Sequence, residues 1–414
     1  MSLESPLSES ASIVVVGLRN AGKSSLVNSI FAKEVAIVSA VPGTTTDPVT
    51  RKMELPGWGP VAFVDTAGID DEGELGEKRV ERTEARLAAA AAVILATPSH
   101  LAPTEAERRL LERIEATGKP AVIALTHADL ARDAAKAAWL AGWKPVAIDN
   151  TSGEGADNLR LAVSALASRA TVENGPLEGL AREGDHFLLV APIDLAAPKG
   201  RLIQPQVETI RDALDRDCTV TVVKERELYE AYRSFRERPR LVITDSQAFS
   251  KAAADIDGDQ ALTSFSILFA RKKGELGPFL RGLRAFSDFP PNGRVFVMEA
   301  CAHHRGADDI ASVKIPRLFS RLVTPAARFQ TVRRLPEDLT SEDVVIHCAG
   351  CMMTGLALRA RVARMEDLGV NATNYGLFLA WANGLLPRAI EPFPDYAEAY
   401  KPLIGQIPGI SAYV

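Results

Sequence analysis

The sequence feature that most restricts the fold is a glycine-rich loop that stands between an apolar run and a helix. Residues 11–17 read ASIVVVG, residues 17–24 read GLRNAGKS, and residues 23–31 read KSSLVNSIF. A short apolar run that ends in glycine is typical of a buried parallel strand. The loop glycines let backbone N–H groups surround a phosphate at the N-terminus of the following helix. We therefore predict a P-loop in a doubly wound α/β sheet, because a glycine-rich turn alone would not need both flanking elements.

The expected nucleotide contacts follow from the chemistry of the loop residues. The ammonium group of Lys23 should reach the β- and γ-phosphates, and the hydroxyl of Ser24 should ligate Mg²⁺. The other loop residues that we expect to contact the nucleotide are Gly17, Asn20, Ala21, Gly22 and Ser25.

Two later motifs complete a nucleotide switch. The motif GTTTD places hydroxyls in a polar connection, where Thr45 or Thr46 is the expected magnesium ligand. The motif PVAFVDTAG predicts a strand that runs into the pattern Asp-x-x-Gly. Asp65 would hold magnesium through water, and the amide of Gly68 would sense the γ-phosphate. Loops of this kind become ordered with a triphosphate and relax after hydrolysis.

The catalytic residues predicted from these motifs are Lys23, Thr46 and Gly68. The group that orients the attacking water stays open, because several acidic residues lie between positions 70 and 77 and nothing distinguishes one of them.

Together these motifs resemble the translation-factor-like GTPases, nearest to the branch that contains potassium-dependent tRNA-modifying enzymes. In that branch an asparagine of the P-loop helps to hold K⁺, and Asn20 occupies its position; the alternative is an asparagine that caps the turn. The guanine motif of the family, Asn-Lys-x-Asp, is replaced here by Thr126, His127 and Asp129 in the sequence THAD. The resemblance therefore implies GTP and GDP binding with guanine recognition mainly through Asp129.

The remainder of the chain divides into further α/β segments. Strand-like runs and amphipathic helices alternate to about residue 170, as a doubly wound sheet requires, with Thr104 as the expected N-cap of one helix. Three β-rich runs separated by helical stretches then predict a small, largely parallel sheet, whose unpaired edges favour association between chains. We expect Cys218 in this sheet to be a buried apolar residue. The predicted domains are 1–172, 173–262 and 263–414.

Three of the four cysteines fall into one constellation near the C-terminus. CAHH supplies Cys301, and HCAGC supplies Cys348 and Cys351, with His303, His304 and His347 interleaved. The runs GRVFVMEAC and DVVIHC read as parallel strands whose C-terminal ends deliver these residues to one edge. Thiolates gathered in this way suit structural zinc or a 4Fe-4S cluster, and composition does not separate the two metals. The cysteines rank above His303 and His347 as ligands, and His304 ranks last.

The whole pattern resembles the FeFe-hydrogenase maturation GTPases of the HydF family. That family joins a potassium-type GTPase domain to a dimerisation domain and a cluster domain with the motif C-x-H, a long spacer and H-C-x-x-C. The resemblance implies a 4Fe-4S cluster on Cys301, Cys348 and Cys351, with His303 or His347 as a candidate fourth ligand. It also implies Mg²⁺ and K⁺ as cofactors, slow potassium-stimulated hydrolysis and a homodimer.

The partners that the resemblance implies are those of a scaffold protein. Such a scaffold would receive a diiron precursor from the radical-SAM maturases HydE and HydG and deliver it to the FeFe-hydrogenase. Two alternatives remain at this stage. One is a tRNA-modification or ribosome-associated GTPase with structural zinc, and the other is a redox or metal-sensing switch without turnover.

Charge and hydropathy limit the other function classes. The formal net charge of −5 argues against a nucleic-acid-binding surface as the main function. No apolar run approaches the roughly 18 residues that cross a bilayer, and the polar first ten residues do not form a signal peptide. We therefore expect a cytoplasmic protein that binds neither nucleic acid nor membrane.

Overall fold

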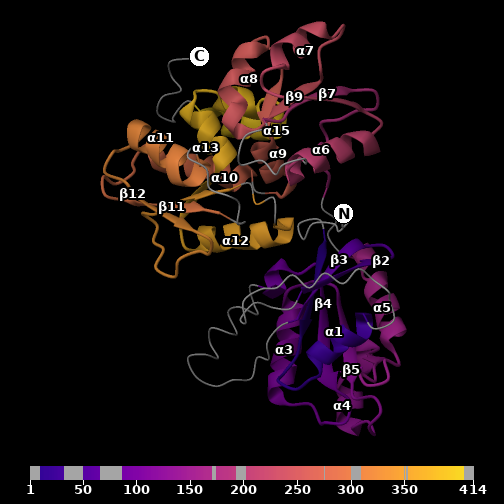
Figure 1. Cartoon of the computed structure of the whole chain (residues 1–414). Helices are drawn as coiled ribbons and strands as arrows, with labels where there is room; N and C mark the ends of the chain where they lie inside the picture. The colour runs from indigo at the N-terminus through magenta and orange to yellow at the C-terminus, as the bar shows by residue number, and fades with distance from the viewer. Residues whose placement is uncertain are drawn as a thin grey trace. The chain divides into compact units, whose positions relative to one another are not determined.

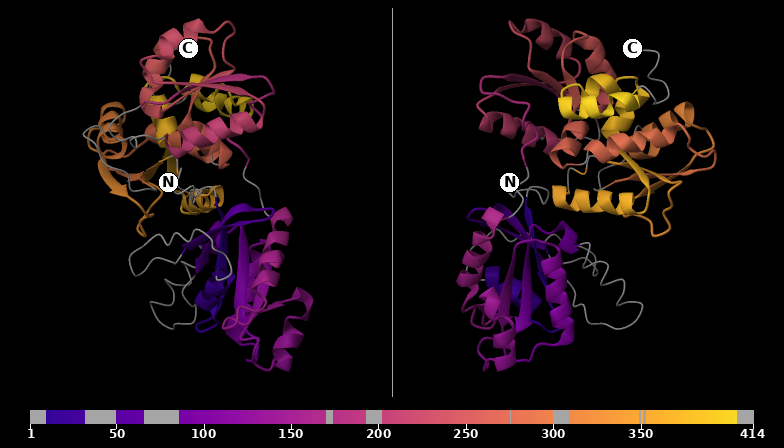
Figure 2. Two further views of the ribbon diagram at one scale, coloured as in Figure 1. Left: turned by 45° about the vertical axis from the view of Figure 1, so that its right-hand side comes forward. Right: turned by 180° about the vertical axis from the view of Figure 1, so that it is seen from behind.

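The computed structural model describes residues 10–31, 50–65, 86–169, 174–192, 202–274, 276–299, 309–348, 350 and 353–404. The chain forms two compact units, residues 1–172 and 173–414 (Figures 1 and 2). Among the described residues, no helix combines the length and the apolar character needed to span a bilayer.

The first unit is built on one six-stranded sheet. Its strands are, in spatial order, β2 (Thr50–Leu55), β3 (Gly59–Asp65), β1 (Ala11–Val16), β4 (Ala92–Pro98), β5 (Ala121–Thr126) and β6 (Val146–Ala147). All neighbours are parallel except β2, which pairs antiparallel with β3. The C-terminal ends of β1 and β3–β6 therefore share one edge of the sheet, where a ligand of a doubly wound sheet is expected.

Helices cover both faces of this sheet. They are α1 (Lys23–Phe31), α3 (Glu105–Ala116), α4 (Ala134–Trp139) and α5 (Ala156–Ala165). Alternate residues of β1 point to opposite faces, so Ile13 packs in the core with α1 and α5, whereas Val14 packs in the core with α3. The predicted N-cap Thr104 is confirmed, and it forms a capping box with Glu107.

The second unit contains two four-stranded parallel sheets. The first has the spatial order β10 (Leu262–Ser264), β9 (Leu241–Thr244), β7 (His186–Val190) and β8 (Thr219–Val223). The second has the order β12 (Arg328–Val332), β11 (Arg294–Met298), β13 (Val344–His347) and β14 (Asn371–Asn374). Every neighbouring pair in both sheets is parallel.

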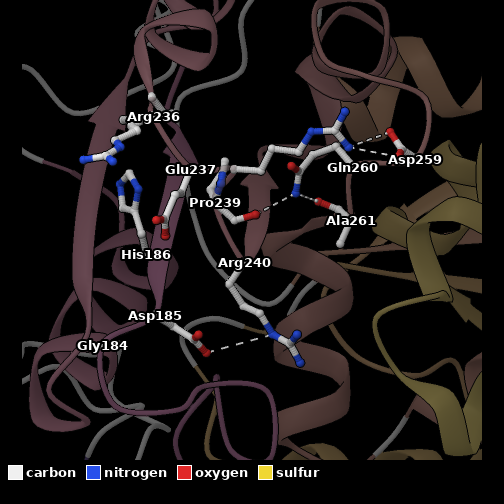
Figure 3. A pocket seen from close by; sticks show the side chains of 12 residues that line it. Gly184, Asp185, His186, Arg236, Glu237, Pro239, Arg240, Asp259, Gln260 and Ala261 are labelled. Carbon is white, nitrogen blue, oxygen red and sulfur yellow. Dashed lines mark hydrogen bonds and ion pairs between the residues drawn. The ribbon is translucent and has the colours of Figure 1, made fainter.

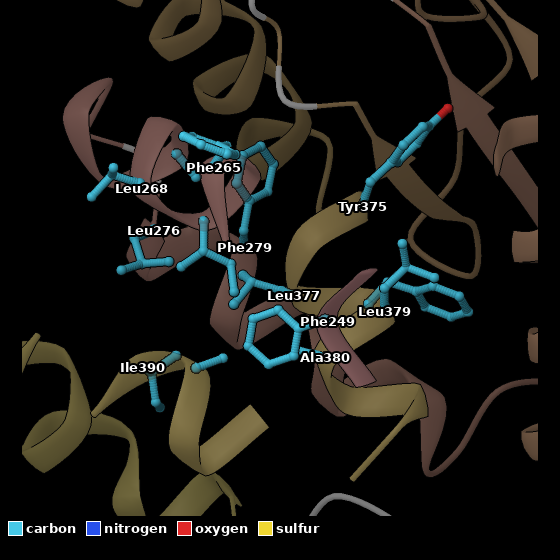
Figure 4. Close-up of a cluster of buried hydrophobic side chains, with 14 of the residues drawn as sticks. Phe249, Phe265, Leu268, Leu276, Phe279, Tyr375, Leu377, Leu379, Ala380 and Ile390 are labelled. Carbon is cyan, nitrogen blue, oxygen red and sulfur yellow. The ribbon is translucent and has the colours of Figure 1, made fainter. Parts of the chain in front are cut away.

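The helices of this unit pack into one continuous core with both sheets. They are α6 (Gln204–Asp215), α7 (Leu228–Ser234), α8 (Phe249–Asp255), α9 (Phe265–Lys272), α10 (Leu276–Gly282), α11 (Ile315–Leu322), α12 (Gly355–Asp367), α13 (Tyr375–Ala382), α14 (Leu386–Ile390) and α15 (Pro394–Ile404). Figure 4 shows side chains of α8, α9, α10, α13 and α14 meeting in that core. Gly376 permits close packing of α13 on α9, because a Cβ there would lie 2.7 Å from the Cβ of Ser266.

The predicted α/β class with three sheets is confirmed, including a P-loop sheet and two parallel four-stranded sheets. Cys218 is buried, as predicted. The sequence did not indicate the antiparallel strand β2, and β6 spans only the two residues Val146 and Ala147. The proposed limit between residues 262 and 263 falls within β10, which pairs with β9 in the first four-stranded sheet.

Candidate nucleotide and cluster sites

The P-loop follows β1 directly and is held by its own lysine. The Lys23 ammonium donates to the carbonyl oxygens of Gly17 at 3.0 Å and Leu18 at 2.6 Å. Gly22 has a φ of +78° and Asn20 a φ of +59°, so the loop turns through two left-handed residues that favour glycine and asparagine. Asn20 lies exposed on the loop. This geometry suits a phosphate, because the lysine can exchange two carbonyl partners for phosphate oxygens.

A magnesium site is indicated where the P-loop meets the end of β3. The Ser24 hydroxyl donates to Oδ2 of Asp65 at 2.5 Å. The other carboxylate oxygen, Oδ1 of Asp65, is buried and has no hydrogen-bond partner in the described part of the chain. Magnesium prefers oxygen ligands and keeps several waters, so a serine hydroxyl beside an incompletely satisfied carboxylate fits Mg²⁺.

Two strand ends from the base-reading side also contact the P-loop. The Thr126 hydroxyl, at the end of β5, donates to the carbonyl of Ala21 at 2.9 Å. The Asn150 amide, after β6, donates to the carbonyl of Gly22 at 3.2 Å. These bonds link the position of the guanine motif to the phosphate loop. Asn150 is a contact that the sequence did not predict, and its only signal was an amide at the end of the last strand-like run before residue 170.

Of the remaining residues predicted to contact the nucleotide, Asp129 and Ser25 lie in the described part of the chain. Asp129 is exposed beside the end of β5, and Ser25 is exposed on the first turn of α1, where its carbonyl accepts from Ser29. Thr45, Thr46 and Gly68 lie outside the described residues.

The second site is at the C-terminal ends of β11 and β13. The two strands are neighbours, with Met298 opposite His347, and the backbone N–H of Cys348 donates to the carbonyl of Met298 at 2.9 Å. The predicted pairing of these strand ends is therefore present, and Cys348 lies at the junction with a half-buried side chain. Cys301, Cys351, His303 and His304 lie outside the described residues.

His347 is fully buried, and both of its ring nitrogens have protein partners. Nδ1 lies 2.6 Å from the carbonyl oxygen of Cys348, and Nε2 lies 3.0 Å from Nη1 of Arg361. A carbonyl only accepts and a guanidinium only donates, so Nδ1 carries the proton and Nε2 is the acceptor. Burial, followed by the charge of Arg361, lowers the pKa of His347 to about 3. His347 is thus a neutral side chain, and ligation of a metal would require Arg361 to release Nε2.

Two cationic side chains converge on the HCAGC loop. The buried ammonium of Lys273 donates to the carbonyl oxygens of Gly350 at 2.5 Å and Met353 at 2.8 Å. Burial lowers the pKa of Arg361, and the neighbouring Cys348 sulfur acts in the opposite direction. A thiolate-ligated cluster carries negative charge, so two cations around the loop fit such a group better than a plain turn.

A carboxylate belongs to the same strand end. Glu299 follows β11, is only 3% exposed, and its backbone N–H donates to Val332. By the register of β11 and β13, it lies beside Cys348. Glu299, Lys273 and Arg361 were not predicted from the sequence. The two basic residues belong to helical segments that read as ordinary solvated faces, and only the charge in MEAC next to a cysteine could have indicated Glu299.

A cavity of about 650 Å³ lies at the amino-terminal edge of the first four-stranded sheet (Figure 3). Its charged walls pair internally: Arg238 bonds Asp259 at 2.9 Å, and Arg240 lies 3.9 Å from Asp185. Burial lowers the pKa of His186 in this wall. The internal pairing leaves no net charge of one sign for a ligand, and the cavity lies at the edge of its sheet opposite to the C-terminal strand ends.

Three family models match the chain. Residues 12–127 match the 50S ribosome-binding GTPase model, residues 177–274 the hydrogen maturase F dimerization domain, and residues 277–392 the hydrogen maturase F tetramerization domain. The last two models fall on the two four-stranded sheets, and together the three cover most of the chain. Domains of these descriptions support a homo-oligomer.

Individual relatives match part of the chain. The chain is 28% identical over 229 residues to the tRNA modification GTPase MnmE of Chromobacterium violaceum, covering 52% of this chain and 50% of that protein. It is 34% identical over 175 residues to MnmE of Geobacillus kaustophilus, covering 41% and 37%. The chain thus spans half or less of the length of these relatives.

Solved structures that match part of the chain include a variant of Aquifex aeolicus Era bound to GDP·AlF4⁻. The identity is 18% and the TM-score 0.32, covering 51% of this chain and 92% of that one. The G domain of the T. maritima iron transporter FeoB is 23% identical with a TM-score of 0.29, covering 38% and 98%.

Proposed function

Because the chain belongs to the hydrogen maturase F family, we propose that it is a GTP-hydrolysing scaffold for assembly of the FeFe-hydrogenase active site. In this proposal it binds a 4Fe-4S cluster and carries a diiron precursor. The observation that carries the cluster assignment is the pairing of β11 with β13, which brings the segment before Cys301 beside Cys348. Lys273 and Arg361 supply positive charge at the same loop.

The proposed cluster ligands are Cys301, Cys348 and Cys351. Three thiolates leave one iron open to a weaker or exchangeable ligand. His303 and His347 were predicted for that position, and Glu299 is a further candidate because its buried carboxylate lies at the same strand end. The two hydrogen bonds of the His347 ring argue against His347.

The proposed nucleotide chemistry is slow, potassium-stimulated hydrolysis of GTP. Lys23 would hold the β- and γ-phosphates, Ser24 and Thr46 would ligate Mg²⁺ with Asp65 behind it, and Asn20 would contact K⁺. The hydrogen bond between Ser24 and Asp65 and the buried second oxygen of Asp65 support the magnesium assignment. Hydrolysis would rearrange the switch loops and so change contacts with partners, without driving bond formation at the cluster.

The partners in this proposal are the radical-SAM maturases HydE and HydG, which would supply the precursor, and the FeFe-hydrogenase, which would receive it. The chain would act as a homodimer or a higher assembly of dimers. Neither nucleic acid nor membrane has a role in this proposal.

The decisive experiment is a comparison of two cysteine variants prepared without air. Cys348→Ser should lose most of the iron and acid-labile sulfide and the electron paramagnetic resonance signal of a reduced 4Fe-4S cluster. Its GTP hydrolysis should remain close to wild type, because the GTPase unit is untouched. Cys218→Ser is the matched control, since Cys218 is a buried thiol directly before β8 that donates to the carbonyl of Arg182. A Cys348→Ser protein with a full cluster would contradict the ligand assignment.

A second candidate function is a tRNA-modification GTPase with structural zinc. The relatives of the GTPase unit that are named tRNA modification GTPases favour it. Stoichiometric zinc without sulfide, together with RNA binding that weakens steeply with salt, would support it over the scaffold.

A further inference from the structure

We propose that a pair of histidines holds the nucleotide base, with His127 as the surface on which the purine stacks and His100 as the positioning residue that fixes its ring. The inference rests on nucleotide binding by the GTPase unit and is independent of the cluster. Both residues follow the C-terminal ends of neighbouring parallel strands, because β4 and β5 pair with Pro98 opposite Thr126. They therefore lie at the edge of the sheet that carries the P-loop.

The backbone of His127 is held in an uncommon conformation. Its φ is +55°, in the left-handed region that few residues other than glycine adopt and in which histidine, asparagine and aspartate are the most frequent of those. Its carbonyl oxygen accepts from the Ser99 hydroxyl at 2.8 Å and from the backbone N–H of Leu130 at 3.1 Å. A strained residue held by several hydrogen bonds is typical of a ligand site, where it fixes the direction of a side chain.

The protonation of the His127 ring follows from its neighbours. The Thr126 hydroxyl has one proton, which it donates to the carbonyl of Ala21. Its oxygen can therefore only accept from Nδ1 of His127, 3.1 Å away, so Nδ1 carries a proton. The chain of bonds from Ala21 through Thr126 to the ring ties the orientation of the imidazole to the phosphate loop itself.

His100 packs against this ring. The two ring centroids are 5.2 Å apart with planes at 66°, which is the edge-on arrangement that aromatic rings prefer. Nδ1 of His100 is buried and has no hydrogen-bond partner among the described residues. A buried nitrogen without a partner is unfavourable. The position of the His100 ring is therefore not stabilised by a hydrogen bond at Nδ1. The contact with His127 does explain it.

The occupant of this surface is the base of a guanine nucleotide. Thr126 anchors the site at the P-loop, and Asp129, two residues beyond His127, is exposed and makes no hydrogen bond or ion pair with any described residue. Its carboxylate can accept from the N1–H and the amino group of guanine. Stacking on an imidazole does not distinguish purines, since every base has a π-face. The histidine pair would thus supply affinity, and Asp129 would supply the choice of base.

The test is calorimetric titration of the full chain with GDP and with IDP, which lacks the 2-amino group. His100→Ala should weaken both nucleotides by the same factor, about two- to tenfold, the range of one aromatic contact. His127→Ala should weaken both by on the order of tenfold. His100→Phe, which keeps an edge-on ring, should bind like the wild type. His186→Ala is the control, because His186 has a comparable ring contact with Phe235 in the second unit.

The inference is overturned if folded His100→Ala binds GDP like the wild type, or if His100→Phe is as weak as His100→Ala. If His100→Ala lowers the melting temperature, its weaker binding could come from lost packing. His100→Phe and His100→Leu both fill the space, and only His100→Phe should keep the affinity for GDP. Failure of the wild type to bind either nucleotide would instead contradict the GTPase part of the proposed function.

Discussion

The two four-stranded sheets of the second unit have the same strand order, and they differ in what their strand ends carry. When the strands of each sheet are numbered along the chain, their spatial order in both sheets is fourth, third, first and second. In the first sheet, the residues directly after the first and third strands are Ala191 and Asp245; in the second sheet they are Glu299 and Cys348. One topology thus brings the same two strand ends together twice, and only one copy has a thiol there. The fold provides the position of the site, and a few substitutions provide its chemistry.

The helices after the fourth strands show that the two copies are also not independent. Both α9 and α13 begin with a side-chain N-cap, Ser264 and Asn374 respectively. At the far ends the equivalent positions are Lys273 and Asn383. Asn383 bonds a carbonyl of its own helix, whereas Lys273 reaches the HCAGC loop of the other sheet. The copy whose first and third strands are not followed by a thiol therefore supports the site of the copy in which Cys348 follows the third strand.

The largest effect on this comparison should come from Lys273→Met. The variant leaves the carbonyl oxygens of Gly350 and Met353 without their buried donor, and each unsatisfied group typically costs about 1–3 kcal/mol. We expect the free energy of unfolding to fall by at least about 2 kcal/mol and the iron content after anaerobic reconstitution to drop. Urea unfolding and iron analysis measure the two effects.

Asn383→Ala is the matched control for Lys273→Met, because it changes the equivalent position in the other copy. It removes one hydrogen bond within α13 and should lower stability by about 0.5–1.5 kcal/mol without loss of iron. If both variants retained iron equally well, the first sheet would have no supporting role at the loop.

Removal of the two N-caps should lower the free energy of unfolding by different, intermediate amounts. Ser264→Ala and Asn374→Ala each remove a side-chain cap, a change that typically costs about 0.5–2 kcal/mol. Each cap residue has one further hydrogen bond: the amide of Asn374 donates to the carbonyl of Ser266 at 3.0 Å and so joins α13 to α9, whereas Ser264 accepts from the Ser246 hydroxyl at the longer distance of 3.3 Å. The cap bond itself is also shorter at Asn374, 2.8 Å against 3.4 Å at Ser264. Asn374→Ala should therefore be the more destabilising of the two in urea unfolding. Equal losses would mean that this cross-link adds nothing to the cap.

The sequence predicts the two sites to different depths. The P-loop is local: Lys23 and the carbonyls that it contacts lie five and six residues apart, so one motif specifies them. The alternation of strands and helices then predicts the α/β class, because each element carries its own period. The two parallel strands that precede Cys301 and Cys348 in the sequence likewise follow from local apolar runs.

The support around the HCAGC loop could not be predicted in this way. Lys273 contacts carbonyls 77 and 80 residues further along the chain, and Arg361 meets His347 from the following helix. These contacts depend on how α9 and α12 pack, which a single sequence does not encode in any spacing. The strand order that the two sheets share was also hidden, because it depends on how the strands pair in space and not on a local motif. His347, predicted as a candidate ligand from its place in the motif, has hydrogen bonds that only the packed structure reveals.

The smallest expected effect is a loss of stability at low pH, which should differ between the amino-terminal edges of the two four-stranded sheets. In the second sheet Asp343, directly before the third strand, accepts from Arg294 at 2.7 and 2.8 Å and is 2% exposed. In the first sheet the residues directly before the first and third strands, Asp185 and Arg240, lie 3.9 Å apart. Burial raises the pKa of Asp343, but hydrogen bonds from Arg294 and Thr340 prevail and lower it below its ordinary value.

A lowered carboxyl pKa means that the unfolded chain takes up the proton first as the pH falls. The stability from Asp343 is therefore present above the unfolded pKa of about 3.9 and is lost as the pH falls through the folded pKa. One proton changes the free energy of unfolding by at most about 1.4 kcal/mol per pH unit. Urea unfolding between about pH 3 and 6 should show this decline in the wild type and in Asp185→Asn, but a smaller one in Asp343→Asn. If Asp343→Asn left the decline unchanged, Asp343 would not be its source. If Asp185→Asn abolished the decline, the acid-sensitive carboxylate would belong to the first sheet.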